Sequence, residues 1–382
     1  MDEIYLDNSA TTRPLPEVIK KINQVLKKDY GNPSSPHKKG ARAEQYLRKA
    51  RNLLATRLEV TNRELYFTSG GTESNNLAIR GTAYNYKNRG QHLITTTIEH
   101  ASVFNVFKAL EEEGFSVSYL QPDKRGLISP QTLKKALTPE TILVSIMQVN
   151  NELGSIQPVG KFSSIIKNYN EDIFFHVDAV QACGKIPVKP KKDGIDLLSL
   201  SGHKFHGPKG TGILYFQNGM LIRPLFEGGG QENYIRSGTE NVPGIAGLIP
   251  ALDALPQFSE QLTINKKLNK LKKHFIFMVK SILPEARINT PRQSAPHIIN
   301  LSFQGIKGEV LVHALEEENI FISTGAACHS RNREDSRVLE AINLPPEYRE
   351  GTIRVSLSEE ITEQQLEYTV NQLKDKLAFF NI

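Results

Sequence analysis

The 382-residue sequence contains only two cysteines, Cys183 and Cys328, so a framework of disulfide bonds does not hold this chain together. Such sparse use of cysteine fits a reducing compartment. No stretch approaches the roughly 20 apolar residues that a membrane span requires. The N-terminal sequence M-D-E-I-Y-L-D-N also lacks the basic start and apolar run of a signal peptide. These absences predict a cytoplasmic protein with no membrane partner.

The chain also lacks a concentrated block of positive charge, although its formal net charge is +6. A net positive charge is compatible with a basic nucleic-acid-binding protein. However, the cations are spread along the chain, as in K-K-I-N-Q-V-L-K-K, and such spacing is typical of solvated helix faces. We therefore predict no direct contact with nucleic acid. No internal repeat or low-complexity segment stands out, and the length allows a large and a small domain.

Short β-rich segments alternate with helical segments between residues 62 and 216. Strands are expected at 64–69, 92–97, 115–120, 141–149, 172–179, 197–201 and 210–216. Helices are expected between many of them, at 72–87, 101–113 and 162–169. This alternation predicts an α/β fold with a mostly parallel seven-stranded sheet flanked by helices. Ligands of such sheets bind at the carboxyl ends of the strands.

The composition changes near residues 251–260, where A-L-D-A-L-P-Q-F-S-E leads into a lysine-rich helical stretch. Strands are then expected at 297–303, 319–324 and 352–357, with helices at 308–317 and 363–379. We predict a large domain over residues 15–255 and a smaller α+β domain over 256–382. Residues 1–14 are predicted to form an arm that joins the small domain.

Polar residues follow several of the predicted strands. Gly70 and Gly71 form a turn into the helix that opens at Thr72, and such a helix N-terminus suits a phosphate, although a plain strand-to-helix turn is equally compatible. His100 follows the next strand and is either a capping or core histidine or a functional one. Asn151 lies in a polar loop after a later strand. By itself it indicates only a polar loop, and only the motifs around it suggest a functional role.

The segments F-F-H-V-D-A-V-Q and S-L-S-G-H-K-F-H-G are more specific. Asp178 ends an apolar strand, where a buried carboxylate requires a cationic partner, and Gln181 follows three residues later. Lys204 lies among glycines beside Ser201 and His203, in a crowded site where a lysine loses its proton more readily and attacks a carbonyl to give a Schiff base. Pyridoxal phosphate requires these parts: a phosphate cradle, a carboxylate opposite its ring nitrogen, an aromatic neighbour and a lysine.

With these motifs in order, the chain resembles a known family. The segments Y-L-D-N-S-A-T-T, G-N-P-S-S-P-H, T-S-G-G-T-E-S-N-N, E-H-A-S-V, N-N-E-L-G, H-V-D-A-V-Q, S-G-H-K-F-H-G-P-K-G and R-S-G-T-E-N are similar to those of the cysteine desulfurases. These are fold-type-I pyridoxal phosphate enzymes of the NifS/IscS-like branch. The resemblance extends over nearly the whole chain.

The resemblance implies roles around the cofactor ring. Lys204 would hold pyridoxal phosphate covalently, and His100 would stack on the ring and take part in catalysis. Asp178 would meet the pyridine nitrogen and Gln181 the phenolic oxygen, while Asn151 would lie beside the ring and the substrate.

The resemblance also implies roles at the phosphate and the substrate carboxylate. Thr239 would reach the phosphate from a second subunit of a homodimer, whereas Asn32 and Arg354 would hold the substrate carboxylate. Within one chain, the expected phosphate contacts are Gly71, Thr72, Ser201 and His203. No metal ligand is implied.

Cys328 lies in I-S-T-G-A-A-C-H-S, where small residues before it and charged residues after it predict an exposed loop. His329, Arg331 and Arg333 would favour its thiolate. The resemblance implies that L-cysteine is converted to L-alanine while its sulfur becomes a persulfide on Cys328. A sulfur-acceptor protein, either an iron–sulfur scaffold or a tRNA-thiolation enzyme, would receive it. A selenocysteine lyase or an aminotransferase-like enzyme on the same fold is the alternative, and Cys328 argues against transamination, which needs no such thiol.

Overall fold

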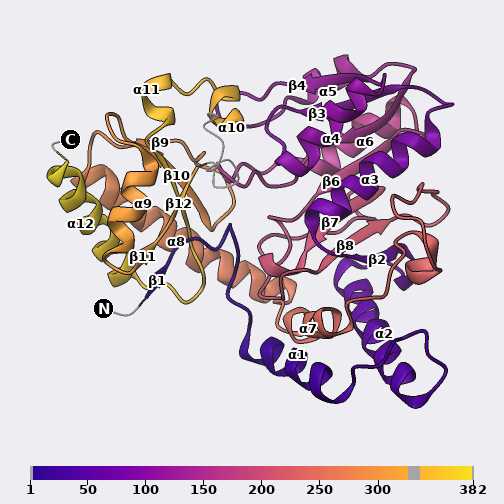
Figure 1. The fold of residues 1–382 in the computed structure, drawn as a ribbon. Helices are drawn as coiled ribbons and strands as arrows, with labels where there is room; N and C mark the ends of the chain where they lie inside the picture. The colour runs from indigo at the N-terminus through magenta and orange to yellow at the C-terminus, as the bar shows by residue number, and fades with distance from the viewer. Residues whose placement is uncertain (1–2, 326–335, 381–382) are drawn as a thin grey trace.

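The computed structural model describes residues 3–325 and 336–380, which are arranged in two lobes around separate sheets (Figure 1). The lobe with the larger sheet contains most of the first 250 residues. The other lobe contains the C-terminal part of the described chain together with its first strand. In these described residues, we find no helix that combines the length and the apolar character needed to cross a membrane.

The larger sheet has seven strands in the order β2-β8-β7-β6-β5-β3-β4. Strand β8 runs antiparallel to both of its neighbours and the other pairs are parallel. The strands are β2 (Leu65–Thr68), β3 (His92–Thr96), β4 (Ser116–Leu120), β5 (Thr141–Ser145), β6 (Phe174–Asp178), β7 (Leu197–Ser201) and β8 (Gly212–Phe216). The predicted α/β class with a mostly parallel seven-stranded sheet is therefore confirmed. The strand expected at 141–149 ends earlier, at Ser145.

Helices cover both faces of this sheet, and the apolar residues of each strand alternate between two cores. In β7, Leu198 and Leu200 point to one core and Leu197 to the other. All three are fully buried, and each such leucine contributes about 1.5–3 kcal/mol to the hydrophobic free energy of folding. Helices α3 (Gly71–Tyr86) and α4 (Ala101–Glu112) pack on the second face. The first face carries α1 (Pro16–Lys28), α2 (Lys38–Leu58), α5 (Pro130–Ala136), α6 (Val159–Tyr169) and α7 (Val242–Asp253).

The second lobe contains a four-stranded antiparallel sheet in the order β12-β13-β10-β9. Its strands are β9 (Arg287–Ile288), β10 (Ile298–Ser302), β12 (Ser323–Thr324) and β13 (Thr352–Ser356). Helices α8 (Phe258–Ile282), α9 (Gly308–Glu316) and α12 (Glu363–Phe379) share one apolar core with this sheet (Figure 1). Two short helices complete this lobe: α10 (Arg337–Ala341) lies on the side facing the other lobe, and α11 (Pro346–Arg349) lies at the top of the view (Figure 1).

The single strand predicted at 319–324 is wrong, because the chain forms two short strands there. Strand β11 (Ile320–Phe321) pairs in parallel with β1 (Ile4–Tyr5), whereas β12 pairs with β13 in the four-stranded sheet. The two pieces pair with different strands, and this long-range pairing divides the segment.

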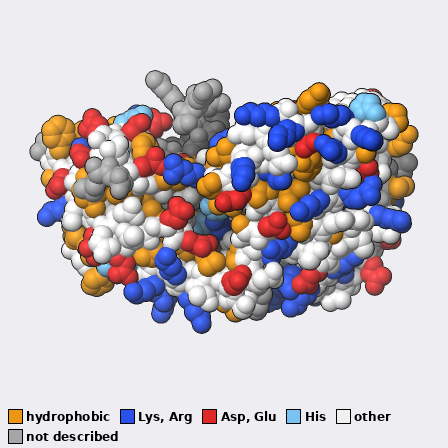
Figure 2. Space-filling view, turned by 90° about the horizontal axis from the view of Figure 1, so that it is seen from below, with side chains coloured by type: hydrophobic (Ala, Val, Ile, Leu, Met, Phe, Trp, Pro, Cys, Tyr) orange, Lys and Arg blue, Asp and Glu red, His pale blue; other side chains and the backbone are white. Residues whose placement is uncertain are grey.

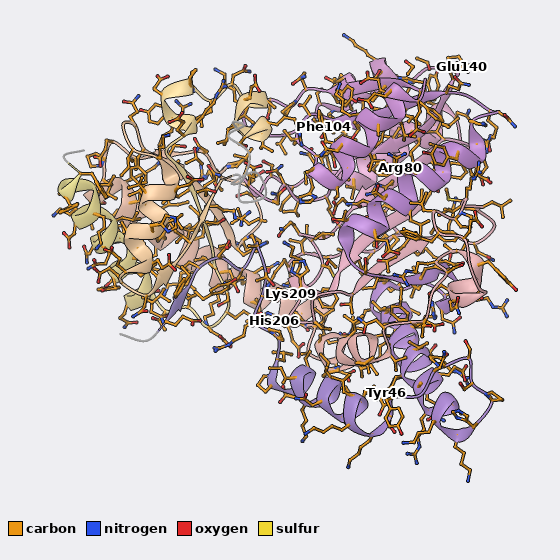
Figure 3. All side chains as sticks on the ribbon, in the orientation of Figure 1. Tyr46, Arg80, Phe104, Glu140, His206 and Lys209 are labelled. Carbon is orange, nitrogen blue, oxygen red and sulfur yellow. The ribbon has the colours of Figure 1, made fainter. Side chains whose placement is uncertain are left out.

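Three short 3₁₀ helices complete the described elements: η1 (Asn62–Glu64), η2 (Gly202–Lys204) and η3 (Gln231–Tyr234). The segment after η2 holds the N-terminal chain as it passes between the lobes. The backbone N–H of His206 donates to Thr12 Oγ1 at 2.7 Å, and its ring Nδ1 lies 3.0 Å from the carbonyl oxygen of Arg13. Figure 3 places His206 and Lys209 in this region between the two lobes.

Positive charge is distributed rather than concentrated on the face that Figure 2 shows. Lys and Arg side chains are spread widely over that face, with acidic side chains among them. This distribution agrees with the spacing of cations along the sequence.

Candidate active site

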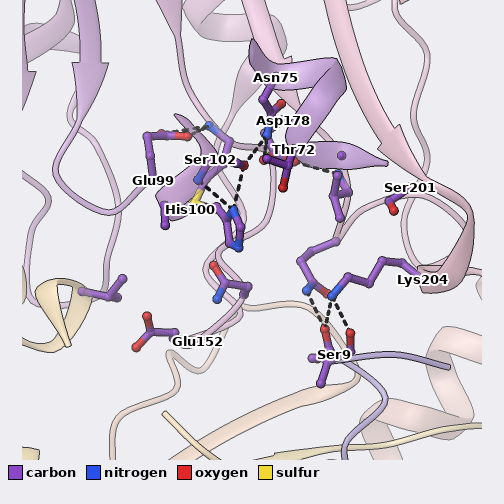
Figure 4. Close-up of a pocket in the computed structure, with 18 of the residues that line it drawn as sticks. Ser9, Thr72, Asn75, Glu99, His100, Ser102, Glu152, Asp178, Ser201 and Lys204 are labelled. Carbon is purple, nitrogen blue, oxygen red and sulfur yellow. Dashed lines mark hydrogen bonds between the residues drawn. The ribbon is translucent and has the colours of Figure 1, made fainter. Parts of the chain in front are cut away.

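A cavity of about 340 Å³ lies at the carboxyl ends of β3, β5, β6 and β7. Its lining brings together all the predicted cofactor residues except Thr239, along with Arg354. Parallel strands present their carboxyl ends at one edge of the sheet, which explains why residues far apart in sequence meet there. Figure 4 shows a close-up of this cavity.

Lys204 ends η2, directly after β7, and its side chain lines the cavity. Its Nζ donates hydrogen bonds to the carbonyl oxygens of Ser9, at 2.6 Å, and Ala10, at 2.8 Å (Figure 4). The N-terminal chain therefore contacts the amine that the sequence predicts to be the Schiff-base lysine.

Asp178 is the last residue of β6, and its side chain is only 5% exposed. Its Oδ2 accepts a hydrogen bond from Asn75 Nδ2 at 2.8 Å, and its Oδ1 accepts one from the backbone N–H of Val180 at 3.0 Å. Both donors are uncharged. A buried carboxylate held by neutral donors at the edge of a cavity is stabilised by a cationic ligand group.

His100 caps the N-terminus of α4, and its Nδ1 accepts a hydrogen bond from the backbone N–H of Ser102 at 3.1 Å. Because Nδ1 accepts this bond, the proton of the neutral ring is assigned to Nε2. Ser102 Oγ accepts a further bond from Asn75 Nδ2 at 2.9 Å. The histidine is therefore connected to Asp178 through Ser102 and Asn75 (Figure 4).

Helix α3 begins at the cavity, where Gly71 and Thr72 line it. Among the described residues no side chain caps this helix N-terminus, so the backbone N–H groups of its first turn are left for a ligand to bind. Ser201 and His203 line the same cavity. Burial, with smaller effects from the charges of Lys204 and Lys209, lowers the pKa of His203 to about 4. His203 is therefore neutral at neutral pH.

Arg354 enters the cavity from the middle of β13 and is 3% exposed. Its Nη1 donates to the carbonyl oxygen of Asn151 at 2.9 Å, and its Nη2 donates to Asp7 Oδ1 at 2.9 Å. Its Nε–H is buried and has no hydrogen-bond partner among the described residues. Burial raises the pKa of Asp7 even though the Arg354 charge lowers it.

Two buried carboxyl groups that the sequence analysis did not select also line the cavity, Glu99 and Glu152. Burial raises the pKa of Glu99 to about 8 and that of Glu152 to about 7. Glu99 accepts hydrogen bonds from Thr96 Oγ1 at 2.7 Å and from the backbone N–H of Met147 at 3.0 Å. Glu152 accepts one from Ser336 Oγ at 2.5 Å.

Two predicted residues among the described ones, Asn32 and Thr239, do not line the cavity of this chain. Asn32 is exposed in the loop between α1 and α2, where its Oδ1 accepts a hydrogen bond from the backbone N–H of Ser34. Thr239 is exposed and lines a different, smaller cavity of about 180 Å³. Cys328 lies outside the described residues. The second cysteine, Cys183, is buried, and burial raises its thiol pKa to about 12.

Other functional residues had weak sequence signals. Asn75 lies four residues after Gly71, so it shares the helix face that begins at the cavity, and this periodicity was available in the T-S-G-G-T-E-S-N-N segment. Asp7 and Ser9 belong to Y-L-D-N-S-A-T-T, but no local pattern indicates that they contact β13 and Lys204.

The cavity residues fit pyridoxal phosphate. The fit rests on the buried Asp178 carboxylate with neutral donors, the uncapped start of α3, and the Lys204 amine at the same cavity. Asn75 Oδ1 and Ser9 Oγ are also buried without hydrogen-bond partners among the described residues. A volume of about 340 Å³ is within the usual range for small-molecule sites.

Comparisons with known sequences agree with this geometry. The family described as "Aminotransferase class-V" matches residues 4–369. The chain is 43% identical to "Cysteine desulfurase IscS" of Dictyoglomus turgidum over 374 residues, which cover 97% of this chain and 94% of that protein. It is also 43% identical to the Methanosarcina thermophila protein of the same name over 365 residues, covering 95% of this chain and 89% of that protein.

Solved structures of NifS-like proteins also resemble this chain. A structure described as "NIFS-LIKE PROTEIN" superposes with a TM-score of 0.92 at 38% identity, covering 99% of this chain and 100% of that chain. Another, described as "SspA in complex with cysteine", has a TM-score of 0.80 at 35% identity and covers 93% of this chain and 98% of that chain. The chain therefore belongs to the class-V aminotransferase family of pyridoxal phosphate enzymes, within its NifS/IscS-like cysteine desulfurases.

Proposed function

We propose that this enzyme removes sulfur from L-cysteine, releasing L-alanine and leaving a persulfide on Cys328. One observation carries the proposal: a single cavity is lined by Lys204, Asp178 and Arg354 in a chain that belongs to the cysteine desulfurases. Together these three residues offer an amine, a buried carboxylate and a carboxylate-binding guanidinium.

We assign pyridoxal phosphate to this cavity, attached to Lys204. Asp178 would hold the protonated pyridine nitrogen, Gln181 would donate to the phenolic oxygen, and the His100 ring would stack on the cofactor. The first turn of α3 would bind the phosphate, with side-chain contacts from Thr72, Ser201 and His203 and the backbone of Gly71. When bound, the cofactor supplies an electron sink for charge that develops at the substrate Cα.

The protein's own groups would then act on the substrate. Arg354 and Asn151 would hold the substrate carboxylate, because a guanidinium binds a carboxylate through parallel hydrogen bonds. Lys204, as a neutral amine, would remove the Cα proton, and His100 would manage the proton of the substrate thiol. Asn32 remains a prediction for carboxylate binding.

The sulfur-transfer step is balanced without an external oxidant or reductant. The Cys328 thiolate would attack the substrate sulfur and form the S–S bond of the persulfide. The Cβ–S bond would break, its electron pair would remain on the carbon side, and protonation there would give alanine. A sulfur-acceptor protein, such as an iron–sulfur scaffold or a tRNA-thiolation enzyme, would later remove the outer sulfur.

We further propose that the working unit is a homodimer in which Thr239 of each chain completes the phosphate site of the other. Its exposed position, away from the cavity of its own chain, supports this arrangement. We also propose a cytoplasmic location, which fits a chain with two cysteines. A fully active monomer in sedimentation under assay conditions would contradict the shared site.

The persulfide is the direct test of the proposed function. After treatment with L-cysteine, mass spectrometry should find one added sulfur on the peptide that contains Cys328, removable by a reducing thiol. Cys328→Ser should still bind L-cysteine and change the cofactor absorbance, but it should release no sulfide. Cys183→Ser is the matched control and should keep the wild-type rate, because Cys183 is buried away from the cavity. Wild-type turnover by Cys328→Ser would contradict the persulfide step.

A further inference from the structure

The N-terminal arm, residues 7–12, contacts two separate functional groups of the cavity. Asp7 Oδ1 accepts a hydrogen bond from Arg354 Nη2 at 2.9 Å. Two and three residues later, the carbonyl oxygens of Ser9 and Ala10 accept hydrogen bonds from Lys204 Nζ. The short segment 7–10 therefore bridges the guanidinium proposed for the substrate carboxylate and the lysine proposed for the cofactor.

This arm is fixed to the strand that carries Arg354. Asn8 Nδ2 donates to the carbonyl oxygen of Ser356 at 3.0 Å, and the backbone N–H of Ser9 donates to Ser356 Oγ at 2.9 Å. Ser356 is two residues from Arg354 on β13, so the same strand holds both partners of the Asp7–Arg354 ion pair. At its other end the arm is held by Thr12 Oγ1, which donates to the carbonyl oxygen of His203 at 3.0 Å.

The ion pair between Asp7 and Arg354 is well placed to fix the guanidinium. The Arg354 side chain is 3% exposed and that of Asp7 is 20% exposed. The other contact of the guanidinium is a neutral carbonyl, that of Asn151, and its Nε–H has no partner among the described residues. Asp7 therefore provides the carboxylate acceptor that restrains this group, in an ion pair in which donor and acceptor both carry charge.

We infer that Asp7 is a positioning residue that holds Arg354 at the correct place for the carboxylate of an α-amino acid. The carboxylate and the amino nitrogen of such a substrate are attached to the same carbon, so Arg354 must lie at a fixed separation from Lys204. The arm sets this separation because it contacts both groups. The inference rests on the proposed function, since it takes Arg354 as the carboxylate site.

The test uses two amines that differ only in the carboxylate, L-alanine and ethylamine. Each is titrated into the cofactor-loaded enzyme, and its apparent dissociation constant is read from the change in cofactor absorbance. Asp7→Ala should weaken L-alanine binding about tenfold and leave ethylamine binding within about twofold of wild type, since only the carboxylate contact is lost. The KM for L-cysteine should rise by a similar factor, with a smaller change in kcat.

Asp7→Asn keeps an oxygen that can accept from Arg354 but removes the charge, so it should weaken L-alanine binding less than Asp7→Ala. It also serves as the test variant if Asp7→Ala does not fold. Asp123→Asn is the matched control, because Asp123 pairs with the exposed Arg125 away from the cavity. It should behave as wild type with both amines.

A double variant tests whether Asp7 acts through Arg354. If it does, adding Asp7→Ala to Arg354→Ala should produce no further weakening of L-alanine binding. Equal weakening of L-alanine and ethylamine by Asp7→Ala, or unchanged L-alanine binding, would overturn the inference. If the wild-type enzyme releases no sulfur from L-cysteine, the proposed function fails, while the comparison of L-alanine with ethylamine still decides the role of Asp7.

Discussion

The two sheets contribute to the cavity in different ways. The seven-stranded sheet provides residues that end or follow its strands: His100 after β3, Asp178 and Ser201 at the ends of β6 and β7, and Lys204 just beyond β7. The four-stranded sheet provides Arg354 from the middle of β13. A parallel sheet collects its strand ends at one edge, whereas an antiparallel sheet has no such edge. We therefore expect variants of the first sheet to impair chemistry and Arg354 variants to impair substrate binding.

The largest effect is expected at Lys204, on the seven-stranded side. Lys204→Ala should lower the turnover of L-cysteine by at least about 1000-fold, because the amine is proposed as both the attachment point and the base. Lys209→Ala is the control, since Lys209 is exposed and does not line the cavity. If Lys204→Ala keeps the wild-type cofactor spectrum and rate, Lys204 is neither the attachment point of the cofactor nor the base.

A smaller loss is expected at Asp178. Asp178→Asn should reduce kcat roughly a hundredfold, because the substitution removes the charge that would pair with the cofactor ring nitrogen. Asp196→Asn is a matched control from the residue just before β7: Asp196 is buried and pairs with Lys167 at 2.7 Å, outside the cavity. The control should lower the thermal midpoint with little effect on kcat, and the opposite pattern would refute the assignment of Asp178.

Arg354→Lys tests the four-stranded side. The KM for L-cysteine should rise about tenfold, equivalent to about 1.4 kcal/mol, because an ammonium cannot reproduce parallel hydrogen bonds to a carboxylate. Steady-state kinetics should show a smaller change in kcat. Arg287→Lys, on the edge strand β9, should leave both constants unchanged. If Arg354→Lys instead lowered kcat at constant KM, Arg354 would act in chemistry rather than in substrate binding, and the proposed difference between the two sheets would be wrong.

The last effect concerns stability rather than turnover, through the pH dependence of the unfolding free energy at Glu99. Burial raises the folded-state pKa of Glu99 from 4.5 to about 8, so the folded state holds a proton that the unfolded state releases. This contribution to stability is present below about pH 4.5 and is lost as pH rises toward 8. Glu99→Gln should therefore flatten the fall in unfolding free energy between pH 5 and about 8, as measured by urea titration. Parallel pH profiles for wild type and variant would show that the carboxyl group is ionised when folded.

The difference between the sheets also explains what the sequence could predict. Asp178 and Lys204 follow apolar strands in an alternating pattern, so strand-end reasoning alone selects them. Arg354 has no such signal, because it lies within a strand, and only the family resemblance selected it. Asp7 and Glu99 were missed because their significance depends on contacts with β13 and Met147, which no local pattern encodes.

The fold, like the site, was predictable where local sequence patterns determine it and not where long-range contacts do. The strands of the large sheet follow from short β-rich segments that alternate with helical ones, but the division of 319–324 into β11 and β12 depends on long-range pairing with β1 and β13. The domain boundaries at residues 14 and 255 remain predictions, and the separate apolar cores of the two lobes support them. The roles of Asn32, Thr239 and Cys328 also remain predictions, because neither Asn32 nor Thr239 lines this cavity and Cys328 is outside the described residues.

The central claim is that this cavity converts L-cysteine to alanine and transferable sulfur. The most direct measurement is the amount of alanine and sulfide formed from L-cysteine by the cofactor-loaded enzyme in the presence of a reducing thiol. The account predicts equal amounts of the two products from the wild-type enzyme and neither product from Lys204→Ala. Sulfide without alanine, or no product from the wild-type enzyme, would contradict it.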